Sequence, residues 1–175
     1  AFQPRATDVD VVLDLMIHDI DLIMALVRSP LLSVDAIGAP VVSEREDIVN
    51  ARINFASGCA ANLTASRVSL KTERTMRIFQ PDAYLVADLA KRKVTSRRKG
   101  KGEMFPGIPN IEQEEFSFDE ADALAHEIAA FVDCVRNGET PAVTGEAGRD
   151  AVQAAQLITD SLQAHRRLLE QSGVI

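Results

Sequence analysis

One segment, residues 9–27, most constrains how this chain folds, because four ionisable side chains between positions 14 and 21 interrupt what would otherwise be a largely apolar run. Its length and apolar content predict one helix from about Val11 to Val27. The helix is expected to end before Ser29-Pro30, since a proline ring cannot continue a helix. A helix with buried and ionisable positions is therefore the first element of the fold.

The ionisable residues of this helix follow a helical spacing. Asp14, His18 and Asp21 are separated by four and then three residues, so their side chains should share one face, whereas Asp19 points elsewhere. A carboxylate one turn before an imidazole orients the ring and raises its basicity. Asp14 and His18 are therefore candidates for a general base that takes a proton from a substrate hydroxyl.

Two other interpretations fit the same spacing. In the first, Asp14 is favoured by the helix macrodipole and His18 is a hydrogen-bonded core histidine. In the second, Asp14, His18 and Asp21 bind a metal ion, although the sequence offers no second cluster of ligand residues, so we expect no metal. Spacing alone leaves the three interpretations open, because carboxylate–imidazole pairs mark functional sites only as a tendency.

Composition narrows the class of partner. The net charge of −7 argues against nucleic acid, because phosphate binding needs a basic face. The basic run over residues 91–101 is interpreted as a solvated strand and loop, with phosphate contact as the alternative. Cys59 and Cys134 have no metal-like spacing, which fits a reduced, cytoplasmic setting. The apolar run at 11–27 carries too many charges to span a bilayer, so we expect no membrane partner.

Strand patterns follow the helix. Residues 49–55 alternate apolar and polar side chains, which is the period of a half-buried strand, and Ser57-Gly58 supplies a hairpin turn. The short connections imply an antiparallel meander. Strands are predicted over residues 34–42, 48–55, 60–68, 75–79, 84–89, 91–96 and 114–118.

Helical patterns return near the end of the chain. Residues 122–136 are amphipathic and end at Asn137-Gly138, and a last helix is expected from about Arg149 to Glu170. Residues 99–110 contain three glycines and two prolines and are expected to form a mobile loop.

The order of helix, strands and helices predicts an α+β fold in a single domain over residues 1–175. The expected architecture is an open, mostly antiparallel sheet with the three helices on one face. Val49, Ile53 and Leu63, or the residues that alternate with them, should lie on the other face. That face is expected to mediate homo-oligomer formation, because exposed apolar sheet surface needs burial.

The chain has no glycine-rich turn between a strand and a helix, and hence no dinucleotide-binding fingerprint. Nucleophile-elbow and phosphate-loop motifs are also missing from the sequence. From its residues alone, the domain has a candidate acid–base pair and no cofactor-binding residues with which to complete a redox reaction.

Several segments in order resemble the glucose–fructose oxidoreductase/inositol dehydrogenase/MocA family. The helix around Asp14 and His18 is similar to the segment that follows the nucleotide-binding Rossmann domain in that family. Later segments are similar to its substrate-domain strands and its C-terminal helices. The matching stretches are Val12–Asp21, Ile53–Gly58, Leu63–Arg67, Glu127–Phe131 and Asn137–Pro141, followed by Gly145 and the last helix.

The resemblance implies a substrate-binding domain whose Rossmann domain lies upstream of this chain. In the family, an Asp and a His four residues apart handle the substrate proton together with a lysine of the nucleotide domain. Here the Asp is Asp14 and the His is His18, and the lysine has no counterpart in the chain. The cofactor would be NAD or NADP, held by the Rossmann domain, and the isolated chain is expected to be inactive.

The lead-in to the first helix most resembles family members that act on UDP-N-acetylglucosamine at the sugar 3-hydroxyl. A free sugar or inositol is the main alternative substrate. Arg5, Arg67, Asp21 and His126 are candidates for substrate contact, with structural ion pairs as the alternative for the two arginines. A non-catalytic binding or oligomerisation module and a metal-dependent hydrolase or isomerase remain as competing function classes.

Overall fold

The computed structural model describes residues 9–71, 73–119 and 122–174. The chain divides into two compact units, one formed by Ala1–Leu70 with Thr140–Ile175 and the other by Lys71–Glu139. Both units contain antiparallel sheet and helix, so the α+β class and the antiparallel pairing predicted from the sequence are confirmed. The single predicted sheet is instead two sheets, one in each unit.

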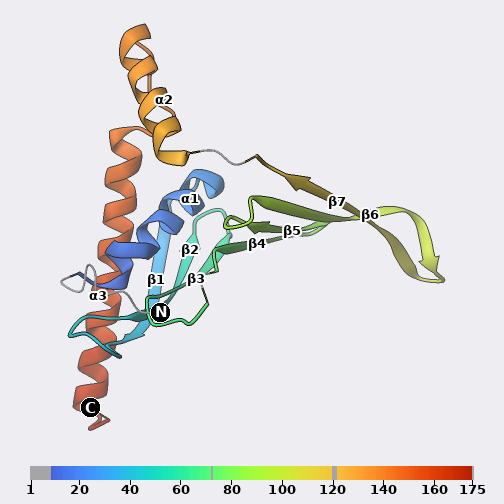
Figure 1. Cartoon of the computed structure of the whole chain (residues 1–175). Coiled ribbons are helices and arrows are strands. Elements are labelled where there is room, and N and C mark those ends of the chain that lie inside the picture. Colours follow the sequence, from blue (N-terminus) through green and yellow to red (C-terminus); the bar gives the residue numbers. More distant parts are fainter. Residues whose placement is uncertain (1–8, 72, 120–121, 175) are drawn as a thin grey trace. The chain divides into compact units, whose positions relative to one another are not determined.

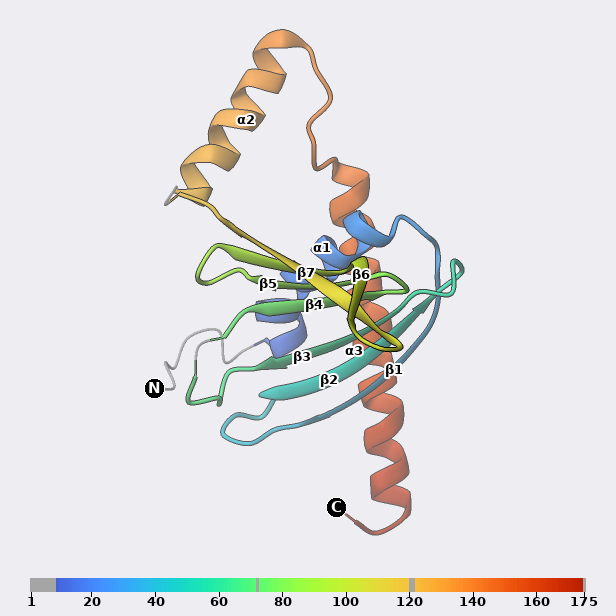
Figure 2. The same cartoon turned by 90° about the vertical axis from the view of Figure 1, so that its right-hand side faces the viewer.

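The first unit contains a three-stranded sheet in the order β1-β2-β3, with β1 at Leu31–Ala39, β2 at Ile48–Phe55 and β3 at Ala60–Ser66. Neighbouring strands run antiparallel, as the short turns between them predict. Helices α1 (Ile17–Val27) and α3 (Gly145–Gln171) contact each other, and α3 also contacts β1 (Figure 1). Turning the molecule shows α3 passing behind the sheet formed by β1, β2 and β3 (Figure 2).

Alternation along β2 decides which sheet face is buried. Val49 and Ile53 are buried in the core cluster, whereas Asn50 and Arg52 between them are exposed. Leu63 of β3 is buried on the same side as Val49 and Ile53. The apolar set of β2 and β3 therefore packs toward the helices, and the outer face of this sheet is mostly polar, with Ile37 of β1 exposed on it. The expectation of an exposed apolar face is wrong in this unit, because the helices cover the face that needs burial.

Helix α3 lies close to β1. It is 27 residues long and buries one small-residue and aliphatic stripe: Ala151, Ala154, Ala155, Ile158 and Leu162. Its Ser161 hydroxyl accepts a hydrogen bond of 2.9 Å from the backbone N–H of Ala36 in β1. Gly38 permits the close approach, because a Cβ atom there would lie 3.1 Å from Leu162 and 2.9 Å from the Ile48 carbonyl oxygen. In the described residues, none of the helices is both long and apolar enough to cross a membrane.

The second unit contains a four-stranded sheet in the order β4-β5-β6-β7. Its strands are β4 at Thr75–Gln80, β5 at Ala83–Asp88, β6 at Lys93–Phe105 and β7 at Ile108–Ser117. The mobile loop predicted over residues 99–110 is wrong, because these residues form the long end of the β6–β7 hairpin. Gly102 and Gly107 adopt positive φ angles there, and the strand register shifts between Lys99 and Glu103. The glycines thus mark a bulge and a tight turn rather than a loop.

The basic run of residues 91–101 lies largely on β6, opposite the acidic strand β7. Lys93 forms a 2.7 Å ion pair with Glu115, Arg97 donates a 2.9 Å hydrogen bond to Gln113, and Arg98 pairs in register with Glu112. Lys93 and Arg97 therefore have an acidic and an amide partner within the hairpin, and Arg98 stands opposite a glutamate. This arrangement favours a solvated strand over a phosphate-binding surface.

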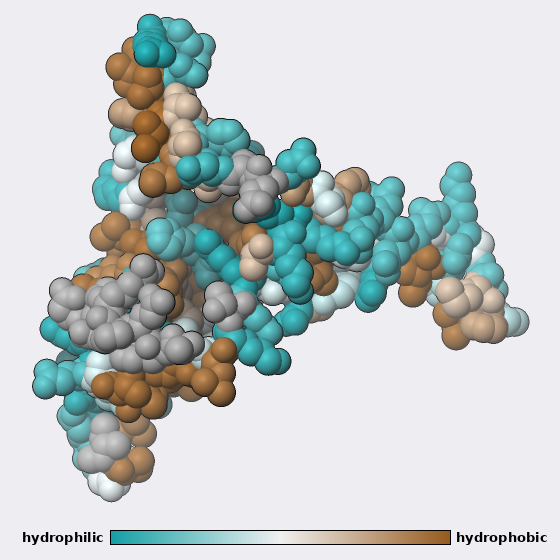
Figure 3. Space-filling view, viewed as in Figure 1, coloured by the Kyte–Doolittle hydropathy of each residue, from teal (hydrophilic) through white to brown (hydrophobic). Residues whose placement is uncertain are grey.

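Helix α2 (Ala123–Asn137) begins at Asp122, whose carboxylate caps the N–H of Ala125, and ends at Gly138 with a positive φ. Its apolar stripe is exposed at Leu124, Ile128, Phe131 and Val135, and α2 buries no residue. Within the second unit, α2 therefore does not cover the β4–β7 sheet, whereas the prediction placed all three helices on one sheet face. Apolar atoms on α2 and at the end of the β6–β7 hairpin are coloured brown in Figure 3.

Candidate functional site

The first helix begins with a cap that the sequence interpretation missed. The buried carboxylate of Asp10 accepts hydrogen bonds of 3.0 Å from the backbone N–H groups of both Val12 and Leu13. Aspartate is a favoured N-cap because its oxygen satisfies helix N–H groups that have no partner within the helix. Asp10 stands directly before the predicted helix, so a search for N-caps is the signal that would have found it.

The turn after the cap is a π-helix over Val12–Met16, in which the N–H of Ile17 bonds to the Val12 carbonyl five residues earlier. Asp14 lies in this wider turn and His18 lies at the start of the regular helix α1. Single π turns are frequent at functional sites in proteins. Nothing in the side-chain pattern of the sequence predicted the change of helical pitch.

The three predicted positions all avoid the buried stripe of this helix. Val12, Met16 and Ile20 are fully buried in the core, whereas Asp14 and Asp21 are half-buried and His18 is exposed. The alternative that His18 is a core histidine is therefore wrong. Its ring is available to a ligand on the outward side of the helix.

Within the residues that the structure describes, no hydrogen bond joins Asp14 to His18. Catalytic hydrogen bonds are often long or poorly aligned in the absence of substrate, so this geometry leaves the pair a candidate. Across the same residues, no group of three His, Cys, Asp or Glu side chains is arranged to hold a metal ion. The metal-site interpretation of Asp14, His18 and Asp21 thus gains no support.

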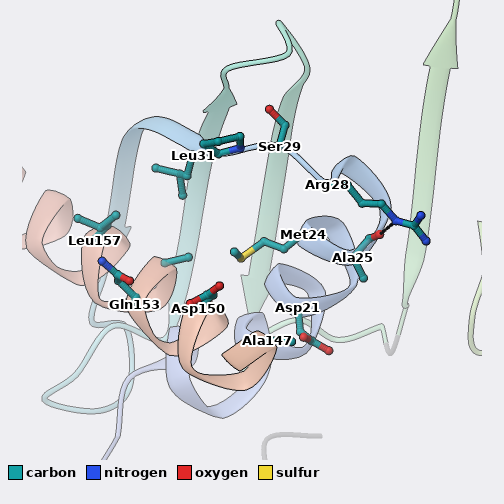
Figure 4. A pocket seen from close by; sticks show the side chains of 12 residues that line it. Asp21, Met24, Ala25, Arg28, Ser29, Leu31, Ala147, Asp150, Gln153 and Leu157 are labelled. Atoms are coloured by element: carbon teal, nitrogen blue, oxygen red, sulfur yellow. Dashed lines mark hydrogen bonds between the residues drawn. The ribbon is translucent and has the colours of Figure 1, made fainter. Parts of the chain in front are cut away.

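Asp21 lines a pocket of about 550 Å³ between the C-terminal half of α1, the start of β1 and the N-terminal half of α3. Figure 4 shows Asp21 and Met24 from α1 on one side of this pocket and Asp150, Gln153 and Leu157 from α3 on the other. Neither Asp14 nor His18 lines it. The structure therefore does not place Asp21 in one cavity with the candidate acid–base pair.

Arg67 is a buried side chain, only 7% exposed, and its guanidinium Nε lies 3.7 Å from the Asp47 carboxylate. Its Nη2 donates a 2.8 Å hydrogen bond to the backbone carbonyl of Val9, next to the helix cap. These contacts are those of a structural ion pair, which is the alternative considered for Arg67. Contact with substrate stays a prediction.

Asp47 is another residue that the sequence interpretation missed. Its carboxylate is completely buried and accepts hydrogen bonds from the backbone N–H groups of Val41, Val42 and Ser43. Burial alone raises the pKa of this carboxyl, but the hydrogen bonds from Val42, Ser43 and Val41 outweigh it and lower the pKa to about 2. The sequence carries no pattern that would have singled out this aspartate.

The other two predicted contact residues lie elsewhere. His126 is exposed on α2, in the second unit, so the structure places it on a different unit from His18. Arg5 lies outside the described residues. The structure thus collects Asp14 and His18 on one helix, and leaves the roles of Arg5 and His126 as predictions.

Comparison with known proteins explains the helix and sheet arrangement. Residues 2–85 match the GFO/IDH/MocA C-terminal domain. The chain is 36% identical over 163 residues to UDP-N-acetylglucosamine 3-dehydrogenase from Acidithiobacillus ferrooxidans, an alignment that covers 93% of this chain and 52% of that protein. The solved structure of that enzyme superposes with a TM-score of 0.85 over the same shares of the two chains. This chain belongs to the GFO/IDH/MocA family.

A second relative is scyllo-inositol 2-dehydrogenase (NAD(+)) from Bacillus subtilis. It is 33% identical over 140 residues, which cover 75% of this chain and 39% of that protein. The chain spans about half the length, or less, of the curated relatives that it matches. Both relatives are dehydrogenases, one named for a nucleotide sugar and the other for a cyclic polyol.

Proposed function

We propose that this domain supplies the acid–base pair of an NAD(P)-dependent dehydrogenase that oxidises a hydroxyl of a sugar or nucleotide sugar. The observation that carries the proposal is the exposed His18, with Asp14 one turn before it, on a helix whose other side is fully buried in the core. Membership of the GFO/IDH/MocA family supports it, because the matched relatives are dehydrogenases of hydroxylated substrates.

In the proposed reaction, the imidazole of His18 accepts the proton of the substrate hydroxyl while the carbon that bears this hydroxyl loses a hydride. The product is a ketone, and His18 becomes an imidazolium. Asp14 stabilises that imidazolium and holds the ring in the productive tautomer, which requires a side-chain rotation that brings the two groups into contact.

The hydride acceptor in this proposal is the nicotinamide of NAD or NADP. The residues of this chain do not fit a dinucleotide site, because no glycine-rich turn links a strand to a helix. We therefore propose that another domain of the full-length protein holds the cofactor and presents it to the outward side of the first helix. The choice between NAD and NADP depends on that domain.

UDP-N-acetylglucosamine, oxidised at the sugar 3-hydroxyl, is the substrate that we propose first. The support is the identity and coverage shared with the Acidithiobacillus ferrooxidans enzyme, which exceed those shared with the inositol dehydrogenase. Arg5, Arg67, Asp21 and His126 remain candidates for contacts with this substrate. An inositol or a free sugar is the competing substrate.

We also propose that two copies of the protein associate through the outer face of the β1–β3 sheet. This face is mostly polar apart from the exposed Ile37, and its side chains form cross-strand hydrogen bonds, from Arg52 to Asn62 and from Thr64 to Asn50. A shallow hollow of about 310 Å³ lies among them. An interface on this surface would be polar and hydrated rather than a continuation of the core.

The substrate assignment is tested with the full-length protein. UDP-N-acetylglucosamine, inositol isomers and glucose are each supplied with NAD or NADP, and the absorbance of reduced nicotinamide is followed. We expect the highest kcat/KM for UDP-N-acetylglucosamine. A higher kcat/KM for an inositol or a free sugar would contradict the substrate, and no turnover of any of them would contradict the dehydrogenase function.

A further inference from the structure

Asp47 and Arg67 form a buried ion pair that is separate from the proposed acid–base pair of Asp14 and His18. The contacts of Arg67 nevertheless reach the start of the helix that carries Asp14 and His18. The Asp47 carboxylate accepts three backbone hydrogen bonds of 2.6–2.9 Å from Val41, Val42 and Ser43. It also accepts a 2.8 Å hydrogen bond from the Ser43 hydroxyl. The carboxylate is therefore fixed by the loop between β1 and β2 before it meets Arg67.

Arg67 connects this fixed carboxylate to the start of the first helix. Its own backbone N–H donates to the Asp47 carbonyl at 2.9 Å, and its side-chain Nη2 donates to the Val9 carbonyl at 2.8 Å. A guanidinium suits this role because it is planar and always charged, so Nη2 can donate to the Val9 carbonyl while Nε lies at an ion-pair distance of 3.7 Å from the Asp47 carboxylate. Through its backbone and its side chain, Arg67 thus joins the end of β3 to Asp47, just before β2, and to Val9, just before Asp10.

Two neighbouring contacts act at the same point. The N–H of Val11 donates to the Glu46 carbonyl at 3.0 Å, and the Asp10 carboxylate caps Val12 and Leu13. Asp14 is then bonded back to the cap residue, since its N–H donates to the Asp10 carbonyl at 3.2 Å. The path from Asp47 to Asp14 is continuous through backbone and side-chain hydrogen bonds.

We propose that Asp47 and Arg67 are positioning residues, which fix the start of the helix that bears Asp14 and His18 against the sheet. A buried ion pair adds little net stability compared with apolar side chains of similar size, so its stabilising effect alone gives a weak reason for it. The ion pair does fix the direction and distance between the two side chains, and hence between the segments that carry them. Such fixing matters for catalysis, because a small misplacement of a reacting group lowers the rate steeply. The inference rests on the proposed function for the role of His18, but the anchoring itself can be measured separately.

The test uses the full-length protein with Asp47→Asn and Arg67→Lys. The amide oxygen introduced by Asp47→Asn can still accept from Val41–Ser43, while the new NH2 group faces the Arg67 guanidinium and removes the attraction between the two side chains. A lysine in place of Arg67 keeps the charge but lacks the fork that reaches both partners. Glu170→Gln and Arg166→Lys are matched controls, because they alter an exposed ion pair on α3 in the same chemical way.

Two readouts are needed. Hydrogen exchange by mass spectrometry should show faster exchange in residues 9–20 of both variants and unchanged exchange in the middle of α3. For Asp47→Asn, kcat should fall by roughly 10- to 100-fold while KM changes by less than about twofold, because this variant leaves every candidate substrate contact in place but loses the alignment of the acid–base pair. Leu162→Val, a core change in α3, serves as a control for loss of stability without loss of the anchor.

Unchanged exchange in residues 9–20 would overturn the proposal. The proposal would also be overturned if Asp47→Asn and Leu162→Val had equal thermal stability and Asp47→Asn lost no more kcat than Leu162→Val. If the wild-type protein oxidises none of the substrates, the proposed function fails, and the exchange of residues 9–20 alone decides whether Asp47 and Arg67 anchor the helix.

Discussion

Arg67 Nη2 donates a hydrogen bond of 2.8 Å to the carbonyl oxygen of Val9, although 58 positions separate the two residues in the sequence. The contact joins the end of the third strand to the chain that enters the candidate catalytic helix. It depends on Asp47, whose buried carboxylate lies 3.7 Å from the Arg67 Nε. We therefore expect Asp47 and Arg67 to hold the chain that enters the candidate catalytic helix.

Acid stability should depend on Asp47. Its pKa is lowered from 3.8 to about 2 in the folded protein, so the ionised carboxylate stabilises the fold above about pH 4. That contribution is lost as the pH falls through the interval between 3.8 and about 2, because the carboxyl must then be protonated. Urea unfolding at a series of pH values should show Asp47→Asn flattening this acid limb. Glu170→Gln should leave the limb unchanged, and an equal slope in wild type and Asp47→Asn would contradict the account.

Two glycine substitutions should act in opposite directions. Gly38→Ala places a Cβ atom 2.9 Å from the Ile48 carbonyl oxygen, a backbone atom, and should lower the free energy of unfolding by about 1–3 kcal/mol.

Gly148→Ala lies inside α3 with no atom within 4 Å of the new Cβ. It should raise the free energy of unfolding by roughly 0.5–1 kcal/mol, because alanine is the better helix former. Thermal unfolding of both variants measures the difference, and a stabilised Gly38→Ala would contradict the packing of α3 on β1.

The helices and strands whose apolar residues recur at a clear helical or strand period could be predicted from the sequence. The alternation of residues 49–55 and the end of the first helix before Ser29-Pro30 are both confirmed by the structure. Long-range contacts could not be predicted in the same way. The Asp47–Arg67 pair and the contact of Ser161 with Ala36 join residues that have no local pattern, so only the folded chain brings them together.

Residues 99–110 show where local composition misleads. Glycine and proline suggested a loop, but cross-strand pairing from Lys93↔Ser117 to Phe105↔Ile108 extends the hairpin through them. Pairing with a partner strand overrides local preference, since β-propensity depends strongly on neighbours. The apolar spacing of the first helix likewise does not reveal the π turn at Val12–Met16.

The isolated 175-residue chain should not bind NADH. The reason is the missing glycine-rich strand-to-helix turn, which provides the phosphate-binding N–H groups in dinucleotide sites. Titration with NADH should give no increase in cofactor fluorescence, while the full-length protein should give a saturable increase under the same conditions. Saturable binding by the isolated chain would show that the cofactor site lies in this domain.

The outer face of the β1–β3 sheet should control association. Thr64→Arg places a bulky charge beside Asn50, to which the Thr64 hydroxyl donates at 2.7 Å in the wild type, and should shift the full-length protein toward the monomer. Gln163→Arg adds the same charge on the exposed side of α3 and serves as the control. Light scattering at micromolar concentration gives the mass of each. An unchanged mass for Thr64→Arg, or a monomeric wild type, would contradict association through this face.

The most direct test of the proposed chemistry is the kcat of full-length His18→Ala, measured beside Asp14→Asn, the double variant and His165→Gln as a control on α3. His18→Ala should lower kcat by roughly 10²–10⁴-fold with cofactor affinity nearly unchanged, because the general base is lost and the nucleotide site is not touched. Adding Asp14→Asn should lower kcat little further, since both residues serve one proton transfer. A folded His18→Ala protein that keeps the wild-type kcat would contradict the assignment of His18 as the base.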